Sequence, residues 1–324
     1  MKPIKFKLTT LPTPLHPLKR LSVYLGGPEI WVKRDDLTDM AMGGNKTRKL
    51  EYLVADALSK GCDTLVTAGA IQSNHCRQTA AAANRAGLSC HLVLNGNPEA
   101  APQGNLLLDT LFGPTIHWVT RDERDSRVNK LGEELKETGL KPYIIPVGGS
   151  NGMGAIGYVD AMLEVMKQAY ALGTDFDLII VASSSGGTQA GLQLGAILSG
   201  FPGTIMGISI DSGKVDGPIY REKMAKIAAE SAAILGEPIR LEPENFNLNC
   251  DYLGQGYSVM GELERNAIHL AAEQEALLVG PVYTGRALGG LIDLIRNGVI
   301  GKNERILFWH TGDTPALFAY SSEL

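Results

Sequence analysis

Short apolar segments alternate with helix-like segments along this chain of 324 residues, and glycine stands at many of the junctions. The apolar runs predict strands at 29–36, 63–69, 89–96, 141–149, 177–183, 204–210 and 305–312. Amphipathic or alanine-rich runs predict helices at 49–61, 76–87, 158–173 and 190–198. Buried strands that alternate with helices are typical of parallel sheets covered by helices on both faces. The sequence therefore predicts an α/β fold.

The composition is that of a globular protein without an extreme charge. Hydrophobic residues make up 44%, charged residues 20%, and the formal net charge is −5, so we expect no nucleic-acid partner. No apolar stretch approaches the roughly 18–20 residues that cross a bilayer, and the first residues lack the apolar region of a secretory signal. The four cysteines have no metal-ligand spacing. We expect a cytoplasmic protein with reduced thiols, no membrane partner and no metal site.

The segment 43–50, GGNKTRKL, places Lys46 at the start of a predicted helix. The partial positive charge of a helix N-terminus, together with Arg48 and Lys49, is expected to lower the pKa of this amine. A lysine with a lowered pKa can attack a carbonyl carbon and form a Schiff base. On this segment alone, a solvated surface lysine is the alternative interpretation.

The loop VASSSGGTQAG, residues 181–191, follows a predicted strand and opens a predicted helix. Backbone N–H groups and hydroxyls of Ser185, Gly186, Gly187 and Thr188 would surround a phosphate at this helix start. The loop has neither a Walker lysine nor the GxGxxG spacing of dinucleotide folds. A glycine-rich connection without a ligand is the alternative.

A second strand-to-helix loop, TAGAIQSNHCRQ at 67–78, carries Gln72, Ser73 and Asn74 in succession. These side chains and the N–H groups of the helix start could bind a carboxylate or a phenolic oxygen. A simple helix N-cap is the alternative. The adjacent His75 and Cys76 are expected to be packed rather than catalytic.

Two further loops at predicted strand ends carry candidate site residues. In GPVYTGRALGG, residues 280–290, Tyr283 and Thr284 precede a helix, and Tyr283 could act as an acid or base or be a core tyrosine. In HTGDTPALF, residues 310–318, Thr311 is the candidate polar group. Together the loops supply a nucleophilic lysine, a phosphate site, an anion-binding helix start and an aromatic ring. Pyridoxal 5′-phosphate is the cofactor that needs all four.

The motifs, in their order along the chain, resemble the fold type II pyridoxal-phosphate enzymes, and within them the aminocyclopropane-carboxylate deaminase/D-cysteine desulfhydrase group. The likeness covers nearly the whole chain and rests on PTPLHPLKRLS, VKRDDLT, GGNKTRKLEYL, GAIQSNHCRQTAAAA, KPYIIPVGGS, SGGTQAGL, PVYTG and HTG…PALFAY. The resemblance implies Lys46 as the Schiff-base lysine. It also implies a small amino-acid substrate and a homodimer.

The resemblance assigns expected roles to individual residues. Asn74 would donate a hydrogen bond to the phenolic oxygen of the cofactor, and residues 185–188 would hold its phosphate. Ser73, with Gln72, would bind the substrate carboxylate. Tyr283 and Tyr257, the second in LGQGYS, would be active-site tyrosines. Thr284 would face the pyridine nitrogen.

The deaminases of the group carry VYEG and HLGG where this chain has Thr284 and Thr311. A carboxylate beside the pyridine nitrogen would keep it protonated and help to open a cyclopropane, whereas a neutral threonine leaves a weaker electron sink that suffices for β-elimination. We therefore expect carbon–sulfur bond cleavage, with D-cysteine as the first candidate substrate. An L-cysteate sulfo-lyase, an aminocyclopropane-carboxylate deaminase and a catalytically silent ligand-binding relative remain alternatives.

Four positions depart from the sequence that the group usually has. Where the group usually has LDPVYTGK, this chain has Gly280 in place of the acid and Arg286 in place of the lysine. Ser258 follows Tyr257 where GYGVP-like sequence is usual, and Asp313 replaces the last glycine of HTGG. Asp313 could change the charge of the site or turn outward. These departures leave the substrate open.

The resemblance also implies two interleaved domains, each with a mostly parallel sheet flanked by helices. The expected large domain combines residues 1–47 and 158–324, and the expected small domain spans 48–157. The cofactor would lie in the cleft between them, where strand-end loops meet.

Overall fold

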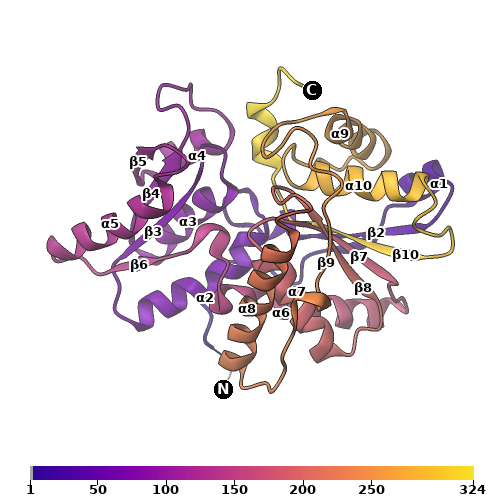
Figure 1. Cartoon of the computed structure of the whole chain (residues 1–324), viewed down its shortest axis with the longest axis horizontal. Coiled ribbons are helices and arrows are strands. Elements are labelled where there is room, and N and C mark those ends of the chain that lie inside the picture. Colours follow the sequence, from indigo (N-terminus) through magenta and orange to yellow (C-terminus); the bar gives the residue numbers. More distant parts are fainter. Residues whose placement is uncertain (1–2) are drawn as a thin grey trace.

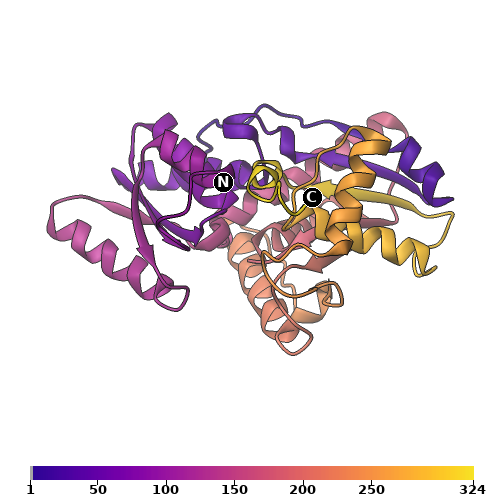
Figure 2. The same ribbon diagram turned by 90° about the horizontal axis from the view of Figure 1, so that it is seen from above.

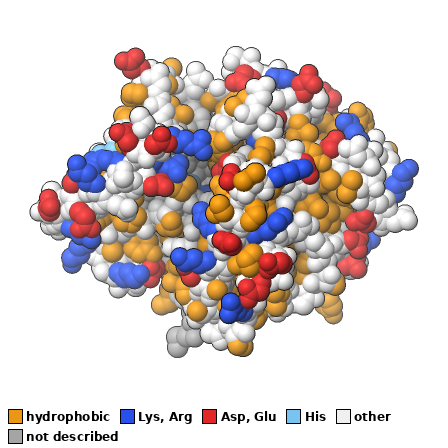
Figure 3. Space-filling view, in the orientation of Figure 1, with side chains coloured by type: hydrophobic (Ala, Val, Ile, Leu, Met, Phe, Trp, Pro, Cys, Tyr) orange, Lys and Arg blue, Asp and Glu red, His pale blue; other side chains and the backbone are white. Residues whose placement is uncertain are grey.

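The computed structural model describes residues 3–324 as an α/β protein with two separate, mostly parallel sheets (Figure 1). The expected fold class is confirmed. Figures 1 and 2 both show the smaller sheet with its helices to one side of the larger sheet. Within the described residues, no helix combines the length and the apolar character that crossing a bilayer requires. On the face in Figure 3, acidic and basic side chains are interspersed with apolar ones.

The larger sheet has six strands in the order β1-β2-β10-β7-β8-β9. β1 runs antiparallel to β2, and every other neighbouring pair is parallel. The strands are β1 (Leu15–Pro17), β2 (Glu29–Arg34), β7 (Leu178–Ser183), β8 (Thr204–Ser209), β9 (Asn247–Asn249) and β10 (Arg305–His310).

Alternate residues of the central strands fill two different apolar cores. Ile180 and Phe308 pack with residues of α1, α9 and α10 on one face. Val181 and Trp309 pack with residues of α6 and α7 on the other face. Because β7 is covered on both faces, all six of its residues are buried, which explains its continuous apolar sequence.

The smaller sheet has four parallel strands in the order β5-β4-β3-β6. They are β3 (Thr64–Ala70), β4 (Ser89–Asn95), β5 (Thr115–Val119) and β6 (Pro142–Ile144). One face packs on α2 and α3, and the other packs on α5. The strand expected at 141–149 is shorter than predicted, because the chain turns into a 3-10 helix at Val147–Gly149.

Ten α-helices and five 3-10 helices connect the strands within residues 3–324. The α-helices are α1 (Lys19–Leu25), α2 (Asn45–Ser59), α3 (Asn74–Ala86), α4 (Gly104–Phe112), α5 (Arg124–Glu137), α6 (Gly152–Leu172), α7 (Gly187–Ser199), α8 (Gly217–Leu235), α9 (Glu262–Glu275) and α10 (Thr284–Arg296). The 3-10 helices are η1 (Asp35–Leu37), η2 (Met40–Met42), η3 (Val147–Gly149), η4 (Pro243–Asn245) and η5 (Thr314–Ala319).

Helices α2 and α6 are the two segments that lead the chain between the sheets, and they pack against each other. At their contact a Cβ atom on Gly157 would lie 2.3 Å from the backbone oxygen of Arg48, so only glycine allows this approach. The expected domain boundaries, 47/48 and 157/158, fall within these two helices. The boundaries themselves stay a prediction.

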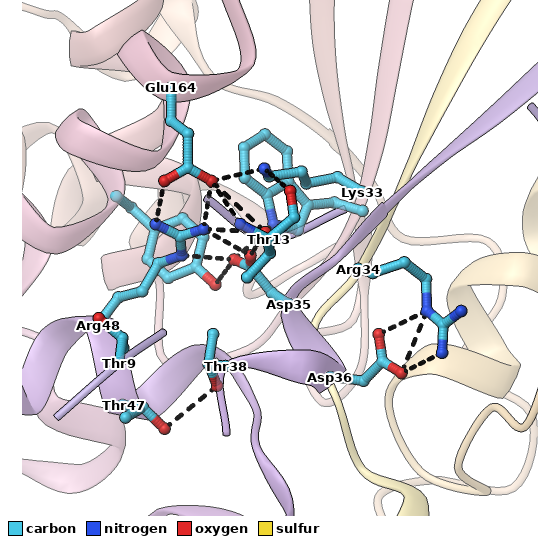
Figure 4. Close-up of polar contacts among 12 residues, drawn as sticks. Thr9, Thr13, Lys33, Arg34, Asp35, Asp36, Thr38, Thr47, Arg48 and Glu164 are labelled. Carbon is cyan, nitrogen blue, oxygen red and sulfur yellow. Dashed lines mark hydrogen bonds and ion pairs between the residues drawn. The ribbon is translucent and has the colours of Figure 1, made fainter. Parts of the chain in front are cut away.

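A buried ionic cluster fixes the start of α2 against the larger sheet (Figure 4). Arg48 donates to both carboxylate oxygens of Asp35, at 3.0 and 2.8 Å, and to Glu164 of α6 at 2.9 and 3.2 Å. Lys33 of β2 donates to the same Glu164 at 2.5 Å. Burial acts to raise the pKa of Asp35, but Arg48 and Lys33 outweigh it and hold the pKa at about 2. The cluster therefore anchors the turn of helix that carries Lys46.

Candidate active site

A cavity of about 750 Å³ lies where the strand-end loops of both sheets meet. Loops after the carboxyl ends of β3, β7 and β10 contribute to its wall, as is typical of ligand sites in α/β proteins. Nine of the predicted site residues line it: Lys46, Ser73, Asn74, Ser185, Gly186, Thr188, Tyr257, Tyr283 and Thr311. Gln72, Gly187 and Thr284 lie outside its lining.

Lys46 stands in the first turn of α2 with its amine at the cavity wall. Its Nζ donates to Oδ1 of Asn45 at 2.9 Å, and Nδ2 of Asn45 donates to the hydroxyl of Thr188 at 3.0 Å. Asn45 therefore links the lysine to the first turn of α7. The sequence reasoning did not single out Asn45, although it is the residue next to Lys46.

The pKa of Lys46 is lowered to about 8, in the expected direction but for a different main reason. Burial lowers it most, the negative charge of Asp313 raises it, and Arg77 lowers it further. Neither Arg48, which is paired with Asp35 and Glu164, nor Lys49 is among the causes. The expectation that these two residues lower the pKa of Lys46 is therefore wrong. An amine with this pKa is partly neutral near neutral pH and can act as nucleophile or base.

The start of α7 forms a cup for an anion. Gly186 has φ +89° and precedes the helix, and the described residues 3–324 provide no acceptor for the N–H groups of Gly186, Thr188 and Gln189. The Ser185 and Ser150 hydroxyl oxygens lie 2.7 Å apart at its edge. The N–H of Gly187 donates instead to Ser150, at 3.2 Å. Free N–H groups at a helix start are the donors that a phosphate needs.

Lys49 and Ser150 extend this cup and were not predicted as site residues. The Lys49 amine is buried, and it donates to the Gly148 carbonyl at 3.1 Å and to the Ser150 hydroxyl at 3.3 Å. Burial lowers its pKa well below the usual range, and the nearby Lys46 and Lys223 lower it further. An anion bound beside Ser150 would favour the charged form of Lys49. The three-residue spacing from Lys46 on one helix face was the available signal.

The start of α3 forms a second anion-binding group. Ser73 is the N-cap, and its hydroxyl accepts from the N–H of Cys76 at 3.2 Å, so the capping interpretation is confirmed. The N–H groups of Asn74 and His75 have no acceptor among residues 3–324. Ser73 and Asn74 also line the cavity, so a capping role and a ligand role are compatible here.

Gln72 and Thr284 use their polar groups elsewhere. Gln72 accepts from the N–H of Asn105 at 2.8 Å and donates to the carbonyl of Gln103 at 3.0 Å. The Thr284 hydroxyl accepts from the N–H of Gly280 at 2.7 Å and donates to the carbonyl of Gly312 at 3.0 Å. The predicted contacts of Gln72 with a carboxylate and of Thr284 with a pyridine nitrogen stay predictions.

Two tyrosines face each other across one part of the cavity. The hydroxyl oxygens of Tyr257 and Tyr283 lie 2.7 Å apart, and their rings meet edge to face at 73°. Burial raises the pKa of both phenols, that of Tyr283 well above its usual range. Both are therefore neutral phenols near neutral pH and can donate a proton. Arg121, from the loop before α5, lies 6.0 Å from the Tyr257 ring centroid.

Asp313 turns inward, which settles one of the two expectations for it. Its side chain is buried, lines the cavity and accepts three hydrogen bonds. Burial raises its pKa to about 6, while the N–H of Tyr283 and the amide of Asn74 act against this. The site therefore contains a carboxylate that is ionised at neutral pH.

His75 and Cys76 are packed, as expected. A ring nitrogen of His75 lies 2.9 Å from the Thr67 hydroxyl, and burial lowers the His75 pKa well below its usual range. Burial raises the pKa of the Cys76 thiol well above its usual range, so it is not a thiolate nucleophile. Among residues 3–324, no group of three or more His, Cys, Asp or Glu side chains could hold a metal ion.

The donors present fit pyridoxal 5′-phosphate. A half-buried amine with a lowered pKa stands one residue from Asn45, which contacts the helix start whose N–H groups are suited to a phosphate. The amine and the cup open into the same cavity. When bound, the cofactor supplies an aldehyde for the amine and a ring that accepts electrons from a substrate carbon.

Comparisons with known proteins agree with this geometry. The family model described as pyridoxal-phosphate dependent enzyme matches residues 7–312. A D-cysteine desulfhydrase of Salmonella typhi is 42% identical over 323 residues, which cover 98% of this chain and 96% of that protein. The solved structure of an ACC deaminase homologue matches with a TM-score of 0.89 at 37% identity, covering 99% of this chain and 95% of the other.

A more distant solved structure, that of maize serine racemase, matches with a TM-score of 0.64 at 18% identity. It covers 93% of this chain and 88% of the other, and it supports the fold alone. The family match over residues 7–312 and the full-length relatives lead to one conclusion. This chain belongs to the family of pyridoxal-phosphate-dependent enzymes.

Proposed function

We propose that this enzyme is a carbon–sulfur lyase that converts D-cysteine and water into pyruvate, hydrogen sulfide and ammonia. The observation that carries the proposal is the place of Lys46. Its half-buried amine lies at the wall of a cavity that is also lined by the anion-binding starts of α7 and α3 and by the tyrosine pair. These are the groups that a β-elimination on a bound amino acid needs.

Each group has a proposed task. The N–H groups at the start of α7, with Ser185 and Thr188, hold the cofactor phosphate. The start of α3, with Ser73, holds the substrate carboxylate. The Lys46 amine takes the proton from Cα of the substrate as general base. The pair of Tyr257 and Tyr283 donates a proton to the departing sulfur, so the leaving group departs as hydrogen sulfide.

The choice of D-cysteine is supported by the relatives and by two neutral residues. D-cysteine desulfhydrases are 42% identical over 98% of this chain. Thr284 and Thr311 stand where the deaminases of the group carry an acid and a leucine, and both are buried. A neutral hydroxyl leaves the cofactor ring a weaker electron sink, which suffices when the leaving group is a thiol.

Cyclopropane ring opening is a second candidate, because Asp313 brings a carboxylate into the same cavity. Elimination of sulfite from L-cysteate uses the same lysine chemistry and is a third outcome that the test includes. We expect the carboxylate of Asp313 to disfavour L-cysteate, because that substrate carries an additional negative charge.

The test combines a lysine variant with a substrate panel. Lys46→Ala is expected to lose the visible absorbance band of the bound cofactor and to lower kcat by at least about 10²–10⁴-fold. Lys60→Ala, on the exposed end of the same helix, is the matched control and is expected to retain both. A Lys46→Ala protein that keeps the wild-type band and turnover would overturn the role of Lys46.

The panel contains D-cysteine, L-cysteine, L-cysteate, β-chloro-D-alanine and aminocyclopropane carboxylate. Pyruvate with sulfide from D-cysteine supports the proposal. Sulfite from L-cysteate, or 2-oxobutyrate from the cyclopropane substrate, with no turnover of D-cysteine would replace it with the corresponding alternative.

We also propose that the two sheets belong to two domains, with the smaller formed by residues 48–157 and the larger by the remainder. All four strands of the smaller sheet lie within 48–157, and all six strands of the larger sheet lie outside it. The proposed homodimer rests on the family resemblance. Sedimentation of the purified enzyme tests it.

A further inference from the structure

The carboxylate of Asp313 contacts the starts of two helices from the two sides of the cavity. Its Oδ2 accepts from the N–H groups of Val282 at 3.1 Å and Tyr283 at 2.8 Å, just before α10. Its Oδ1 accepts from Nδ2 of Asn74 at 2.6 Å, the first residue of α3. Asp313 is 3% exposed, so these bonds are shielded from water. One side chain therefore joins the Tyr283 helix to the Asn74 helix.

The hydrogen bonds of Asn74 also determine the orientation of its side-chain amide, that is, which side its oxygen and its nitrogen face. Asn105 donates to the Gln72 carbonyl at 3.0 Å and to Oδ1 of Asn74 at 3.1 Å. Oδ1 of Asn74 is thus an acceptor, and its Nδ2 must face an acceptor on the other side. The ionised Asp313 carboxylate has no proton to donate and fills that role. One hydrogen of Nδ2 remains for a ligand in the cavity.

Gly280 provides the space that Asp313 occupies. A Cβ atom at residue 280 would lie 2.3 Å from the Asp313 backbone oxygen and 2.5 Å from its Cβ and Cγ. The group to which the sequence is similar has an acid at position 280 and glycine at 313, and this chain has the reverse. Asp313 also has a φ of +82°, a value that favours glycine. The aspartate therefore occupies this position despite backbone strain.

We propose that Asp313 is a positioning residue of this active site. Its carboxylate holds the Asn74 amide and the backbone of Tyr283 in one geometry, and it places a negative charge in the cavity that Lys46 also lines. It does so from the space that an acid at position 280 would otherwise fill. The proposal rests on the proposed function only in that Lys46 reacts with the cofactor and Tyr283 faces the substrate.

Three variants test the proposal. Asp313→Gly removes the carboxylate and suits the positive φ, so it is expected to fold. Asp313→Asn keeps the shape but sets an amide donor against the Asn74 donor or against the N–H groups. The double variant Gly280→Asp with Asp313→Gly returns a carboxylate to this space from the other segment. Glycine at 313 removes the clash with Cβ and Cγ, and its conformational freedom lets the backbone oxygen at 313 move away from the new Cβ.

The first measurement needs no substrate. Pyridoxal phosphate is added to the apo enzyme at a series of pH values, and the growth of its visible absorbance band reports the neutral fraction of Lys46. Asp313 interacts electrostatically with Lys46 on α2, Arg77 on α3, Tyr257, Tyr283 and Tyr320, and Lys46 interacts in the same way with Lys49 and His75. Since a negative charge raises the pKa of an amine, both single variants are expected to move the midpoint downward by roughly 0.5–1 pH unit. The double variant is expected to return it toward wild type.

The second measurement is the split between kcat and KM. We expect Asp313→Gly to lower kcat by about 10²-fold, with a smaller change in KM, because the Tyr283 and Asn74 groups lose their alignment. Recovery in the double variant supports the proposal. A folded Asp313→Gly enzyme with wild-type midpoint and kcat overturns it, as does an unchanged midpoint in Asp313→Asn. A folded double variant that behaves like Asp313→Gly overturns it too.

The two proposals fail in different ways. If the wild type does not turn over D-cysteine, the substrate assignment is wrong, and the band midpoint still tests Asp313. If D-cysteine is the substrate and the midpoints do not move, only the role of Asp313 is wrong.

Discussion

The hydroxyl oxygens of Tyr257 and Tyr283 lie 2.7 Å apart although the two residues come from different segments of the larger sheet region. Tyr283 immediately precedes α10, and Tyr257 lies in the loop between β9 and α9. One of the two phenols donates to the other, so one phenol proton lies in this hydrogen bond and the second remains available to a ligand. The two side chains therefore act as a unit, and the loss of one hydroxyl changes the hydrogen bonding of the other.

This coupling predicts non-additive kinetics. Tyr283→Phe and Tyr257→Phe are each expected to lower kcat, by up to about 10²–10⁴-fold for the phenol that donates to the leaving group. The double variant is expected to be little worse than the more damaged single variant. Steady-state kinetics on all four enzymes gives the coupling energy, which we expect to be about 0.5–3 kcal/mol. If the two single losses in kcat simply multiply in the double variant, the coupling of the two phenols through their hydrogen bond is contradicted.

Arg286 fixes the loop that carries Tyr257. It donates to Glu264 at 2.5 Å, to the carbonyl of Ile210 at 2.9 Å, and to the carbonyls of Gly256 and Val259 at 3.2 and 3.0 Å. Arg286→Lys keeps the charge but cannot reach all of these acceptors, so we expect a loss of about 1–3 kcal/mol in unfolding free energy.

Chemical denaturation measures this loss, and hydrogen exchange of residues 256–259 should become faster. Arg296→Lys, at the exposed end of the same helix, is the control and should change little. Unaltered exchange in Arg286→Lys would show that other contacts hold the loop.

Asp35 is expected to stabilise the fold in a pH-dependent way. Its pKa is about 2 in the folded protein, below the unfolded value of about 3.9, so its stabilisation is present above pH 4 and is lost as the pH falls toward 2. Asp35→Asn leaves the buried Arg48 paired with Glu164 alone and should cost about 3–5 kcal/mol at neutral pH. The variant should also lose less stability than wild type between pH 5 and 2, by roughly 2–3 kcal/mol.

Denaturation curves at several pH values check both statements, with the exposed Asp122→Asn as control. An Asp35→Asn protein with the wild-type acid sensitivity would place the titrating group elsewhere.

Asp109 of α4 is expected to have the opposite pH dependence. Both its oxygens are buried without a donor among residues 3–324, and burial raises its pKa to about 8 although Arg77 acts against this. The folded state keeps the proton that the unfolded state loses near pH 4. Stability from this group is therefore complete below pH 4 and lost as the pH rises through 8.

Asp109→Asn should remove this loss. The difference in unfolding free energy between variant and wild type is expected to grow with pH, by at least about 1 kcal/mol between pH 5 and pH 9. Urea denaturation at these two values measures it. A difference that stays constant or shrinks would mean that Asp109 is ionised in the fold.

The strands that the sequence predicts and those that it misses differ in one physical respect. The expected strands at 63–69 and 177–183 match β3 and β7, which are interior strands with almost all residues buried. β1, β5 and β9 were not predicted, and all three are short strands at sheet edges. The fourth edge strand, β6, was predicted, but over too long a range. An edge strand has one neighbour and one exposed side, so it needs no long apolar run.

The site residues also divide into those that the sequence predicts and those that it misses. Lys46, Ser73 and Ser185 stand at or just before helix starts that have a local sequence pattern, and the structure brings them to one cavity. The sequence could not place Ser150, which reaches the cup from a segment far along the chain. Nor could it decide the direction of Asp313, because that depends on the space left by Gly280. Such contacts arise from tertiary packing rather than from local spacing.

The packing of Gly157 against Arg48 has a consequence for motion. If the smaller sheet rotates toward the larger one, the two helices that connect them form the axis, and the contact of Gly157 with Arg48 marks its position. Lys46 is two residues before Arg48 on the same helix, whereas Arg121 lies in the loop between β5 and α5 of the smaller sheet region. The same rotation would swing the Arg121 loop through a long arc and leave the lysine almost still. Such a rotation would move Arg121 relative to the Tyr257 ring without displacing the nucleophile.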